Sequence, residues 1–360
     1  MPVHIPLPSL EALTDPAELS RLLERPVTTV TAVPVDDAQT STEARFQRLT
    51  LDDGSAPGLF VKIVDPAQDW VAYVTADDRR RAVALWSEGL FERMPSEADA
   101  AVLACAEWED GYAVLMPDLG AQLPVSGAVL APAGFDALLE AMAAMHAAFW
   151  GDASLDDPHL GLCAPEAFLS HTSPGRAARH RKQHDSWIFG VVEEGWDALP
   201  TFMDAGLVAE LRALNDDPAP ILRALEACPR TLVHSDIRPA NFAIGQSNGA
   251  HSVAFIDWGR PLAGAASLDL GYLLGWTVFE RPYPVDEVIA NYEDALQRRL
   301  PTRLDAAWWE RVRDVGILGG LLNTICFHAL GARGEDEAAA TEASTLGWWQ
   351  PRMRRALSYL

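Results

Sequence analysis

The feature that most constrains the fold is the stretch 232–259, where two short apolar runs each lead directly into a polar cluster. The first cluster, HSDIRPAN at residues 234–241, has the spacing H-x-D-x-x-x-x-N, and the second places an Asp directly after the run Val-Ala-Phe-Ile. Between the clusters, the sequence Gln-Ser-Asn-Gly is typical of a turn. The stretch therefore predicts two neighbouring strands in a hairpin-like unit that brings Asp236, Asn241 and Asp257 to one place.

These three side chains suit the transfer of a phosphoryl group. An Asp in the position of Asp236 can accept the proton of a substrate hydroxyl. Oxygen atoms of Asn241 and Asp257 are suitable ligands for Mg²⁺, which keeps several waters and bridges phosphate groups. A single Asp or Asn at the end of a strand usually only caps a turn, but the linked spacing of several such residues favours a site.

The sequences HSDIRPANF at 234–242 and IDWG at 256–259 resemble the aminoglycoside phosphotransferase/choline kinase-like superfamily. The pattern of that superfamily is roughly H-G-D-x-x-x-x-N followed by I-D-W or I-D-F. A third feature, an Asp-Leu pair at Asp269, follows the second sequence by about a dozen residues. The layout is also that of the protein-kinase motifs H-R-D-x-x-x-x-N and D-F-G, with Ser235 in place of the Arg and Trp258 in place of the Phe.

The resemblance implies a role for each of five residues. Asp236 would be the catalytic base, and Asn241 and Asp257 would be the Mg²⁺ ligands. His234 and Asp269 would brace the catalytic loop. The implied cofactors are Mg²⁺ and ATP, or GTP in its place.

Composition places the chain among ordinary globular proteins. Its 360 residues exceed one usual domain, and 49% of them are hydrophobic and 22% charged. The net charge of −23 argues against binding nucleic acid or an anionic membrane through a basic patch. The charge is compatible with a cationic small-molecule acceptor, and equally with nothing more than an acidic surface.

Nothing in the sequence indicates export or a membrane span. The first ten residues have no basic segment and no long apolar run, and no stretch approaches 18 consecutive apolar residues. Cys105, Cys163, Cys228 and Cys326 are widely separated and form no C-x-x-C pair. We therefore expect a cytoplasmic protein with reduced, mostly buried thiols, without a zinc site or a disulfide framework.

The first third of the chain predicts a sheet. Strands are expected at 27–35, 44–51, 59–64, 101–107 and 112–116. Lys62 shares one face of its strand with Phe60 and Val64, which indicates a partly buried ammonium that needs anionic partners. By resemblance it matches the strand lysine that contacts the α- and β-phosphates, and the alternative is a surface lysine whose ammonium reaches solvent.

The loop at 36–42 departs from the superfamily pattern because it contains no glycine, the residue that normally lets a backbone approach phosphates closely. Thr40 and Ser41 are expected to contact the nucleotide instead, through their hydroxyl and backbone N–H groups. Asp36 and Asp37 would repel phosphate if they faced it.

A second departure concerns the glutamate that pairs with the strand lysine in kinases. The helix expected at 79–88 has Ala82 where relatives often carry that glutamate. Glu88 and Glu92 are the available carboxylates, four residues apart on one helix face. The sequence does not decide which of them, if either, pairs with Lys62.

Residues 116–120, Met-Pro-Asp-Leu-Gly, break the strand pattern at the point where the superfamily has its hinge. The resemblance implies that backbone groups of Met116 and Asp118 contact the base of the nucleotide. We therefore expect a nucleotide-binding lobe at 1–117 and a helical lobe, with the catalytic loop and acceptor pocket, at 118–360.

The remainder of the chain predicts helices. They are expected at 135–150, 204–214, 219–227, 270–279, 286–300 with an Asp cap, and 304–330, with a further helix at the C-terminus. The irregular segment 159–196 corresponds to the insert that shapes the acceptor pocket in the superfamily. One ring of each tryptophan pair, 308–309 and 348–349, is a candidate for lining that pocket.

The predicted fold is α+β and protein-kinase-like, with a small, mainly antiparallel sheet lobe and a larger helical lobe. The predicted activity is transfer of a nucleoside triphosphate γ-phosphate to a hydroxyl of a small molecule, which is an aminoglycoside, choline or another amino alcohol, or a sugar. The rival hypothesis is a catalytically impaired nucleotide-binding pseudokinase or regulatory module. The glycine-free loop and the missing glutamate favour this rival, whereas Asp236, Asn241 and Asp257 oppose it. Oligomeric state stays open.

Overall fold

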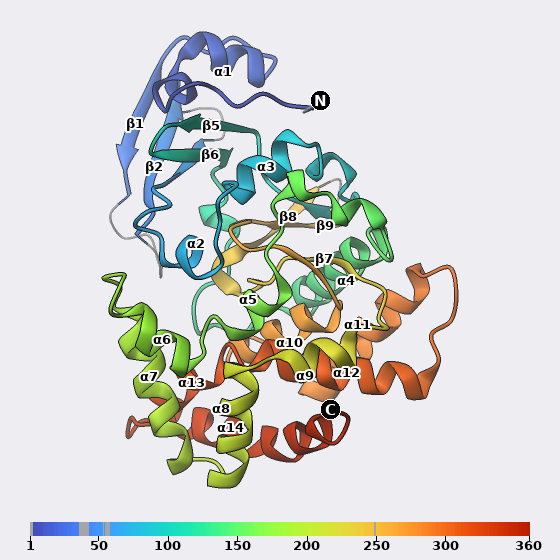
Figure 1. The fold of residues 1–360 in the computed structure, drawn as a ribbon. Coiled ribbons are helices and arrows are strands. Elements are labelled where there is room, and N and C mark those ends of the chain that lie inside the picture. The colour runs from blue at the N-terminus through green and yellow to red at the C-terminus, as the bar shows by residue number, and fades with distance from the viewer. Residues whose placement is uncertain (1–2, 36–42, 53, 55–57, 248–249) are drawn as a thin grey trace.

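The computed structural model describes residues 3–35, 43–52, 54, 58–247 and 250–360 (Figure 1). The predicted nucleotide contacts Thr40 and Ser41 lie outside these described residues. A small lobe built on a sheet lies above a larger lobe that is mainly helical. The α+β, protein-kinase-like fold class is therefore confirmed.

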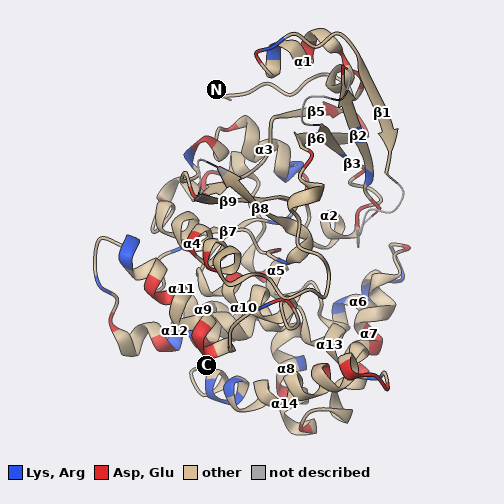
Figure 2. Ribbon diagram, turned by 180° about the vertical axis from the view of Figure 1, so that it is seen from behind, with Lys and Arg blue, Asp and Glu red and all other residues tan. Residues whose placement is uncertain are grey.

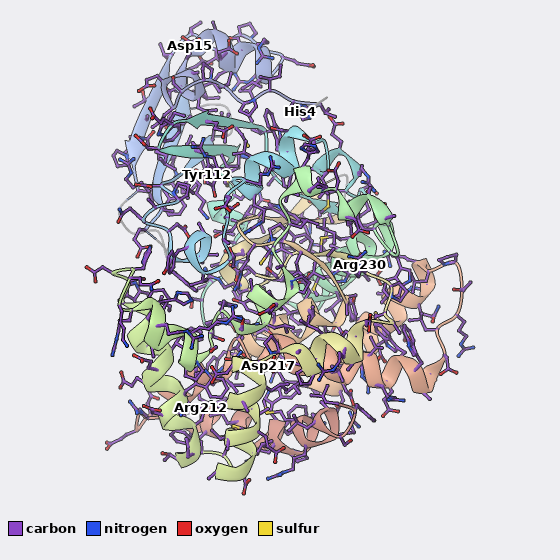
Figure 3. The ribbon with its side chains drawn as sticks, in the orientation of Figure 1. His4, Asp15, Tyr112, Arg212, Asp217 and Arg230 are labelled. Atoms are coloured by element: carbon purple, nitrogen blue, oxygen red, sulfur yellow. The ribbon has the colours of Figure 1, made fainter. Side chains whose placement is uncertain are left out.

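The small lobe is built on a five-stranded antiparallel sheet with the order β1-β2-β3-β6-β5. The strands are β1 (Val30–Pro34), β2 (Arg45–Leu51), β3 (Leu59–Val64), β5 (Ala104–Trp108) and β6 (Gly111–Pro117). Lys62 lies on β3, opposite Phe46 of β2 and Val114 of β6. Helix α1 (Pro16–Leu22) begins at Asp15, whose carboxylate accepts the Ala17 N–H at 2.9 Å as an N-cap (Figure 3).

Two short helices, α2 (Trp70–Val74) and α3 (Arg81–Ser87), follow β3 and lie between the sheet and the large lobe. Arg81 is only 2% exposed and joins three segments of the chain. Its guanidinium donates to the carbonyl oxygens of Gly161 at 2.5 Å and Gly259 at 2.8 Å, and to the Thr75 hydroxyl at 3.1 Å. The start of α3 is thereby fixed to the loop that follows Asp257.

A second sheet contains one strand from the first part of the chain, before residue 117, and two strands from the part that follows. Its strands are β4 (Ala98–Asp99), β8 (Phe242–Ser247) and β9 (Ala250–Phe255). β8 and β9 form the antiparallel hairpin that the turn sequence predicts, and β4 joins β9 in parallel. β7 (Thr231–Val233) pairs instead with β10 (Leu262–Gly264). The expectation that the two apolar runs of 232–259 are neighbouring strands is therefore wrong, because those runs, β7 and β9, lie in different sheets.

The large lobe is a helical array. Its helices are α4 (Pro132–Ala148), α5 (Pro165–Ser170), α6 (Pro174–His180), α7 (Ile188–Ala198), α8 (Ala205–Asp216), α9 (Ala219–Leu225), α10 (Ser267–Trp276), α11 (Val285–Arg299), α12 (Ala306–Leu321), α13 (Ile325–Gly331) and α14 (Glu337–Leu357). α10 and α12 approach so closely that a Cβ atom at Gly320 would lie 2.4 Å from the backbone nitrogen of Tyr272. The glycines of α12 allow this contact.

The prediction of one continuous helix over 304–330 is wrong. This range contains two separate helices, α12 and α13, whose axes are bent by 53° relative to each other. The Asn323 side chain donates to Gly319 O at 3.3 Å, and the Thr324 hydroxyl donates to Leu321 O at 3.0 Å. Such bonds compete with the helical ladder. The predicted Asp cap of the preceding helix is also wrong: α11 begins directly after Pro284, without a side-chain cap.

Acidic side chains are distributed over helices of both lobes and interspersed with Lys and Arg (Figure 2). The four cysteines are buried, as predicted. Within the described ranges, no helix taken singly meets the length and hydropathy criteria for crossing a membrane; the bent pair α12–α13 meets them jointly.

Candidate active site

The loop that carries Asp236 follows β7 and is held by a carboxylate from α10. Asp269 is fully buried, and its two oxygens accept the backbone N–H groups of His234 at 2.8 Å and Ser235 at 2.6 Å. The oxygen that accepts from His234, Oδ2, also lies 3.1 Å from His146 Nε2. These bonds fix the backbone directly before Asp236.

The two polar turns share an unusual backbone conformation. Ser235 and Asp257 are both left-handed, with φ of 68° and 69°. A residue with a side chain adopts this region at a cost of about 1–3 kcal/mol, and such strain is typical of functional sites. The Ser235 hydroxyl donates to Arg260 O at 2.7 Å, which ties the first turn to the second.

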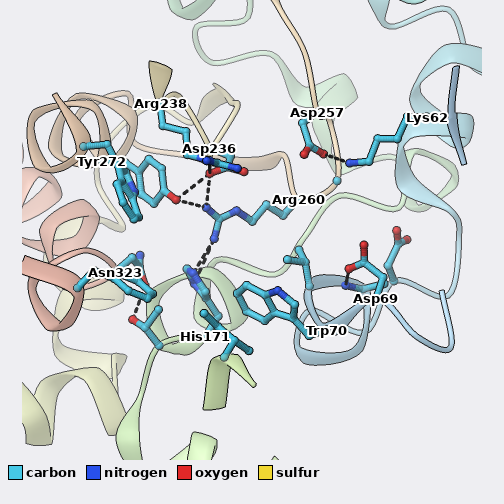
Figure 4. A pocket seen from close by; sticks show the side chains of 18 of the residues that line it. Lys62, Asp69, Trp70, His171, Asp236, Arg238, Asp257, Arg260, Tyr272 and Asn323 are labelled. Atoms are coloured by element: carbon cyan, nitrogen blue, oxygen red, sulfur yellow. Dashed lines mark hydrogen bonds and ion pairs between the residues drawn. The ribbon is translucent and has the colours of Figure 1, made fainter. Parts of the chain in front are cut away.

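The Asp236 carboxylate is held through one of its two oxygens. Oδ1 accepts hydrogen bonds from Arg260 Nη2 at 2.8 Å and from the Tyr272 hydroxyl at 2.7 Å (Figure 4). Arg238 Nε lies 3.5 Å from the same oxygen. Burial alone would raise the pKa of Asp236, but Arg260, Arg238 and the Tyr272 hydrogen bond outweigh it and lower that pKa to about 2.

Arg260 is 4% exposed and completes a buried network with His171. Its Nη1 lies 2.6 Å from His171 Nε2, while His171 Nδ1 lies 2.7 Å from Phe168 O. Because a guanidinium only donates and a carbonyl only accepts, His171 is neutral with its proton on Nδ1. Burial, followed by the Arg260 charge, accordingly lowers the pKa of His171 to about 3.

Lys62 Nζ lies 2.5 Å from Asp257 Oδ1 and is thus brought next to the second polar turn. Burial lowers the pKa of Lys62, but the charges of Asp257 and Asp69 outweigh this effect and leave the pKa above its ordinary value. In the described part of the chain, neither Glu88 nor Glu92 is within ion-pairing distance of Lys62, and Glu92 pairs with His4 at 2.9 Å.

Asp69 is a site residue that the sequence analysis missed. It is 6% exposed and caps α2, accepting the Ala72 N–H at 2.9 Å. Burial raises its pKa, and the charge of Lys62 opposes that effect. The available signal was an Asp directly before the apolar run Trp-Val-Ala-Tyr-Val, which also reads as an ordinary N-cap.

Asn241 and Asp257 offer the kind of oxygen donors that Mg²⁺ takes. Asn241 Nδ2 donates to Asp236 O at 3.0 Å, which turns its amide oxygen away from that carbonyl. No group of three or more His, Cys, Asp or Glu side chains that could hold a metal occurs in the described part of the chain. A site with one carboxylate and one amide fits Mg²⁺, because this ion completes its shell with water and phosphate oxygens.

Two adjoining pockets lie between the lobes. The first, here called the nucleotide pocket, has among its lining residues the predicted Lys62, Met116, Asp118, Asn241 and Asp257. The Asp118 carboxylate pairs with Arg48 at 2.7 Å and its N–H donates to Gly58 O at 3.0 Å, so this N–H is already used in the sheet.

The second pocket contains Asp236 and shares Lys62, Arg238, Asp257 and Trp276 with the first. It is here called the aromatic pocket after its uncharged walls, which comprise Trp70, Thr172, Trp187, Trp276, Asn323 and Phe327. Neither of the tryptophan pairs that were candidates for lining an acceptor pocket contributes to its lining in the described structure. The members of those pairs at 309 and 349 are instead buried, at 7% and 2% exposure.

The fold of the chain has counterparts among solved structures. In sequence, no curated protein matches the chain. The Plasmodium vivax ethanolamine kinase is similar in structure, with a TM-score of 0.50 and 11% identity over 91% of this chain and 84% of its own. The Cryptosporidium parvum choline kinase is similar with a TM-score of 0.50 and 11% identity over 91% and 90%. These likenesses show a shared fold.

Aminoglycoside 2′-phosphotransferase-IIIa is also similar, with a TM-score of 0.48 and 12% identity over 94% of this chain and 96% of its own. In sequence, the model of the phosphotransferase enzyme family matches residues 40–307, about three quarters of the chain, and this range includes Lys62, Asp236, Asn241 and Asp257. The protein therefore belongs to the phosphotransferase enzyme family.

Proposed function

We propose that the protein transfers the γ-phosphoryl group of ATP or GTP to a hydroxyl group of a small molecule, in a reaction that depends on Mg²⁺. The observation that carries this proposal is the meeting of Asp236, Asn241, Asp257 and Lys62 where the two pockets join. A nucleotide in one pocket and an acceptor in the other would have their reacting groups at this border.

Asp236 would receive the proton of the acceptor hydroxyl. Its Oδ1 is engaged by Arg260 and Tyr272, so Oδ2 is the oxygen that would face the acceptor. With a pKa of about 2, Asp236 is ionised at neutral pH and is a weak base. Its contribution is therefore orientation of the hydroxyl, with proton transfer late in a loose transition state.

The cationic side chains of the site would neutralise the negative charge of the phosphates. Lys62 would contact the phosphates of the nucleotide, and Arg238, which lines both pockets, would lie beside the group in transfer. Asn241 and Asp257 would hold Mg²⁺, which when bound neutralises phosphate charge. Positioning and charge stabilisation supply most of the catalysis in reactions of this class.

The decisive variant is Asp236→Asn, which keeps the shape of the side chain and removes its ability to accept a proton. We expect turnover to fall by about 10³-fold, while the dissociation constant for the nucleotide changes little because Asp236 lies outside the nucleotide pocket. The measurements are phosphoryl transfer from radiolabelled ATP and binding of a fluorescent nucleotide. Asp197→Asn is the matched control, since that carboxylate pairs with Arg212 on the surface.

Full activity of Asp236→Asn would contradict the proposal. Nucleotide binding by the wild-type protein without turnover on any acceptor would instead favour the rival hypothesis of a binding module without catalysis.

A further inference from the structure

The Tyr272 hydroxyl forms two hydrogen bonds in the described structure, and both are to the candidate active site. It donates to Asp236 Oδ1 at 2.7 Å and accepts from Arg260 Nη2 at 2.6 Å (Figure 4). Because a guanidinium donates and cannot accept, the single proton of the hydroxyl points to Asp236. Burial raises the pKa of Tyr272, so the hydroxyl keeps this proton at neutral pH.

Arg260 completes the arrangement around this carboxylate oxygen. Its Nη2 also donates to Asp236 Oδ1 at 2.8 Å, so the carboxylate oxygen, Nη2 and the Tyr272 hydroxyl contact one another in a closed triangle. Its Nη1 is held by His171 Nε2 at 2.6 Å, and its guanidinium carbon lies 4.9 Å from the centre of the Tyr272 ring. Its Nε has no hydrogen-bond partner within the described residues. The orientation of the guanidinium therefore depends on His171, Tyr272 and Asp236.

Arg238 also lies near Asp236 Oδ1, but its contact is longer, with Nε at 3.5 Å. Arg238 lines both pockets, and in the proposed reaction a phosphoryl group beside it would compete for its guanidinium. Tyr272 and Arg260 line the aromatic pocket and not the nucleotide pocket, so bound nucleotide would not compete for them. These two residues would continue to hold the carboxylate during phosphoryl transfer.

Fold stability alone explains this buried polar group poorly. A buried ion pair contributes little net stability compared with apolar side chains of similar volume. The helix that carries Tyr272, α10, is placed by its close contact with α12 at Gly320, which does not involve the hydroxyl. The direct effect of the group is geometric: two donors on Oδ1 hold the Asp236 carboxylate in one orientation, because turning it would break both hydrogen bonds.

We propose, as a refinement that rests on the function proposed above, that Tyr272 is a positioning residue of the phosphoryl transfer. Its hydroxyl, together with the Arg260 guanidinium, holds one oxygen of Asp236 and leaves the other oxygen to receive the acceptor proton. In that step the bond between the γ-phosphorus and the leaving oxygen of the nucleotide breaks, and the acceptor oxygen forms the new P–O bond. The acceptor proton passes to Asp236 and then to solvent, while Tyr272 keeps its own proton.

The test uses two matched Tyr→Phe variants of the full-length protein. Tyr272→Phe removes the hydroxyl and keeps the ring beside Arg260. Tyr283→Phe is the control, because the Tyr283 hydroxyl also donates to a carboxylate, that of Asp136 at 3.0 Å, and Tyr283 lines neither pocket. Urea unfolding of both variants checks that each is folded.

The rate is measured in single turnovers, with the protein in excess over radiolabelled ATP or GTP, Mg²⁺ present, and kanamycin, choline or glucose as acceptor. Hydrolysis, in which water is the acceptor, is followed in parallel and is the rate compared where transfer is not detected. We expect Tyr272→Phe to lower the rate by about tenfold, because an orienting hydrogen bond to a charged group is lost. The acceptor KM and the nucleotide dissociation constant should stay unchanged, and Tyr283→Phe should change none of these values.

A double-mutant cycle asks whether Tyr272 acts through Asp236. Asp236→Asn removes the proton-accepting carboxylate, so the orientation of that side chain no longer affects the rate. We therefore expect the double variant Asp236→Asn, Tyr272→Phe to be as slow as Asp236→Asn and no slower. A hydroxyl that contributes only to general stability, or that acts on another group, would give independent losses that multiply.

The outcomes separate the two proposals. An active wild type with an equally active Tyr272→Phe variant, or independent losses in the double variant, overturns the positioning role and leaves the phosphotransferase proposal standing. A raised acceptor KM at an unchanged single-turnover rate also overturns it, because Tyr272 would then bind the acceptor. A wild-type protein that catalyses neither transfer nor hydrolysis overturns the proposed function and this refinement with it.

Discussion

Asp257 is the acidic residue that connects the two pockets of the site. It lies in a left-handed turn, pairs with Lys62 at 2.5 Å and lines both pockets. A carboxylate in this position has two tasks: it neutralises a buried ammonium, and in our proposal it provides an oxygen for Mg²⁺. A substitution that removes one of these tasks and keeps the other would show which of the two is required for nucleotide binding.

We predict that Asp257→Ala weakens binding of the Mg²⁺-nucleotide by at least about tenfold, because one hard oxygen ligand is lost. Asp257→Asn keeps an amide oxygen and is expected to bind with intermediate affinity. Calorimetric titration with and without Mg²⁺ measures both variants. Equal affinity of Asp257→Ala and the wild type would contradict the assignment of Asp257 as a metal ligand.

For single residues, the sequence predicts the candidate site where the spacing of residues within a motif is enough to define it. Asp236, Asn241 and Asp257 follow from two motifs, and the structure brings them together with Lys62. Arg260 could not be predicted in the same way, because an Arg after a turn usually lies in solvent. Its burial depends on His171 and on other partners distant in the sequence. No local pattern reports such a contact.

At the scale of elements, the contact of α10 with α12 positions the site, because α10 carries Asp269 and Tyr272. A Cβ atom at Gly320 would lie 2.4 Å from the Tyr272 backbone nitrogen. Glycine at this position therefore permits the close contact between the two helices.

We predict that Gly320→Ala destabilises the fold by about 2–3 kcal/mol, because the methyl group forces the two helices apart. The control is Gly347→Ala in α14, where a Cβ atom meets nothing within 4 Å and the substitution should stabilise the helix by up to about 1 kcal/mol. Urea unfolding followed by circular dichroism measures both. Equal stability of the two variants would show that the helices can adjust without cost.

The same region shows where a pattern read along the sequence fails. Apolar periodicity runs without interruption through 304–330 and predicts one helix. The break between α12 and α13 is made by Asn323 and Thr324, whose side chains bond to carbonyls of the preceding turn. Polar residues also occur within unbroken helices, so composition alone cannot locate this break.

At the scale of the whole molecule, the burial of His171 makes the free energy of unfolding depend on pH. Burial and the Arg260 charge hold the pKa of His171 at about 3, below the ordinary value of 6.5. Between these values the unfolded chain binds a proton that the folded chain does not bind. Stability therefore falls as pH falls from 6.5 towards 3, by about 1.4 kcal/mol per pH unit from this residue.

We predict that His171→Gln, which can still accept from Arg260, unfolds with a shallower pH dependence than the wild type between pH 6.5 and 4.5. The expected difference is about 1 kcal/mol per pH unit, measured by urea unfolding at several pH values. His234, whose pKa is also lowered by burial, leaves part of the slope in place. An identical slope in variant and wild type would contradict a neutral His171 in the folded state.

The overall fold followed from the sequence through the motifs and the family they resemble, whereas total charge does not decide the acceptor. The net charge of −23 is compatible with a cationic acceptor and equally with an acidic surface. Four Asp side chains line the aromatic pocket, and Asp257, Asp236 and Asp77 form ion pairs with Lys62, Arg260 and Arg81. The division of the chain at residue 117 stays a prediction, and β4, which precedes it, pairs with a strand that follows it.

Arg81 has a mechanical consequence for a protein of two lobes. Its guanidinium holds carbonyls of Gly161 and Gly259 from one lobe and a side chain of the other, all at hydrogen-bonding distance. Sliding the lobes past one another would break several of these bonds at once, whereas swinging them about the guanidinium would stretch each bond only slightly. The molecule thus has a fixed connection beside the turn that carries Asp257, and we expect any relative movement of the lobes to be a rotation about it.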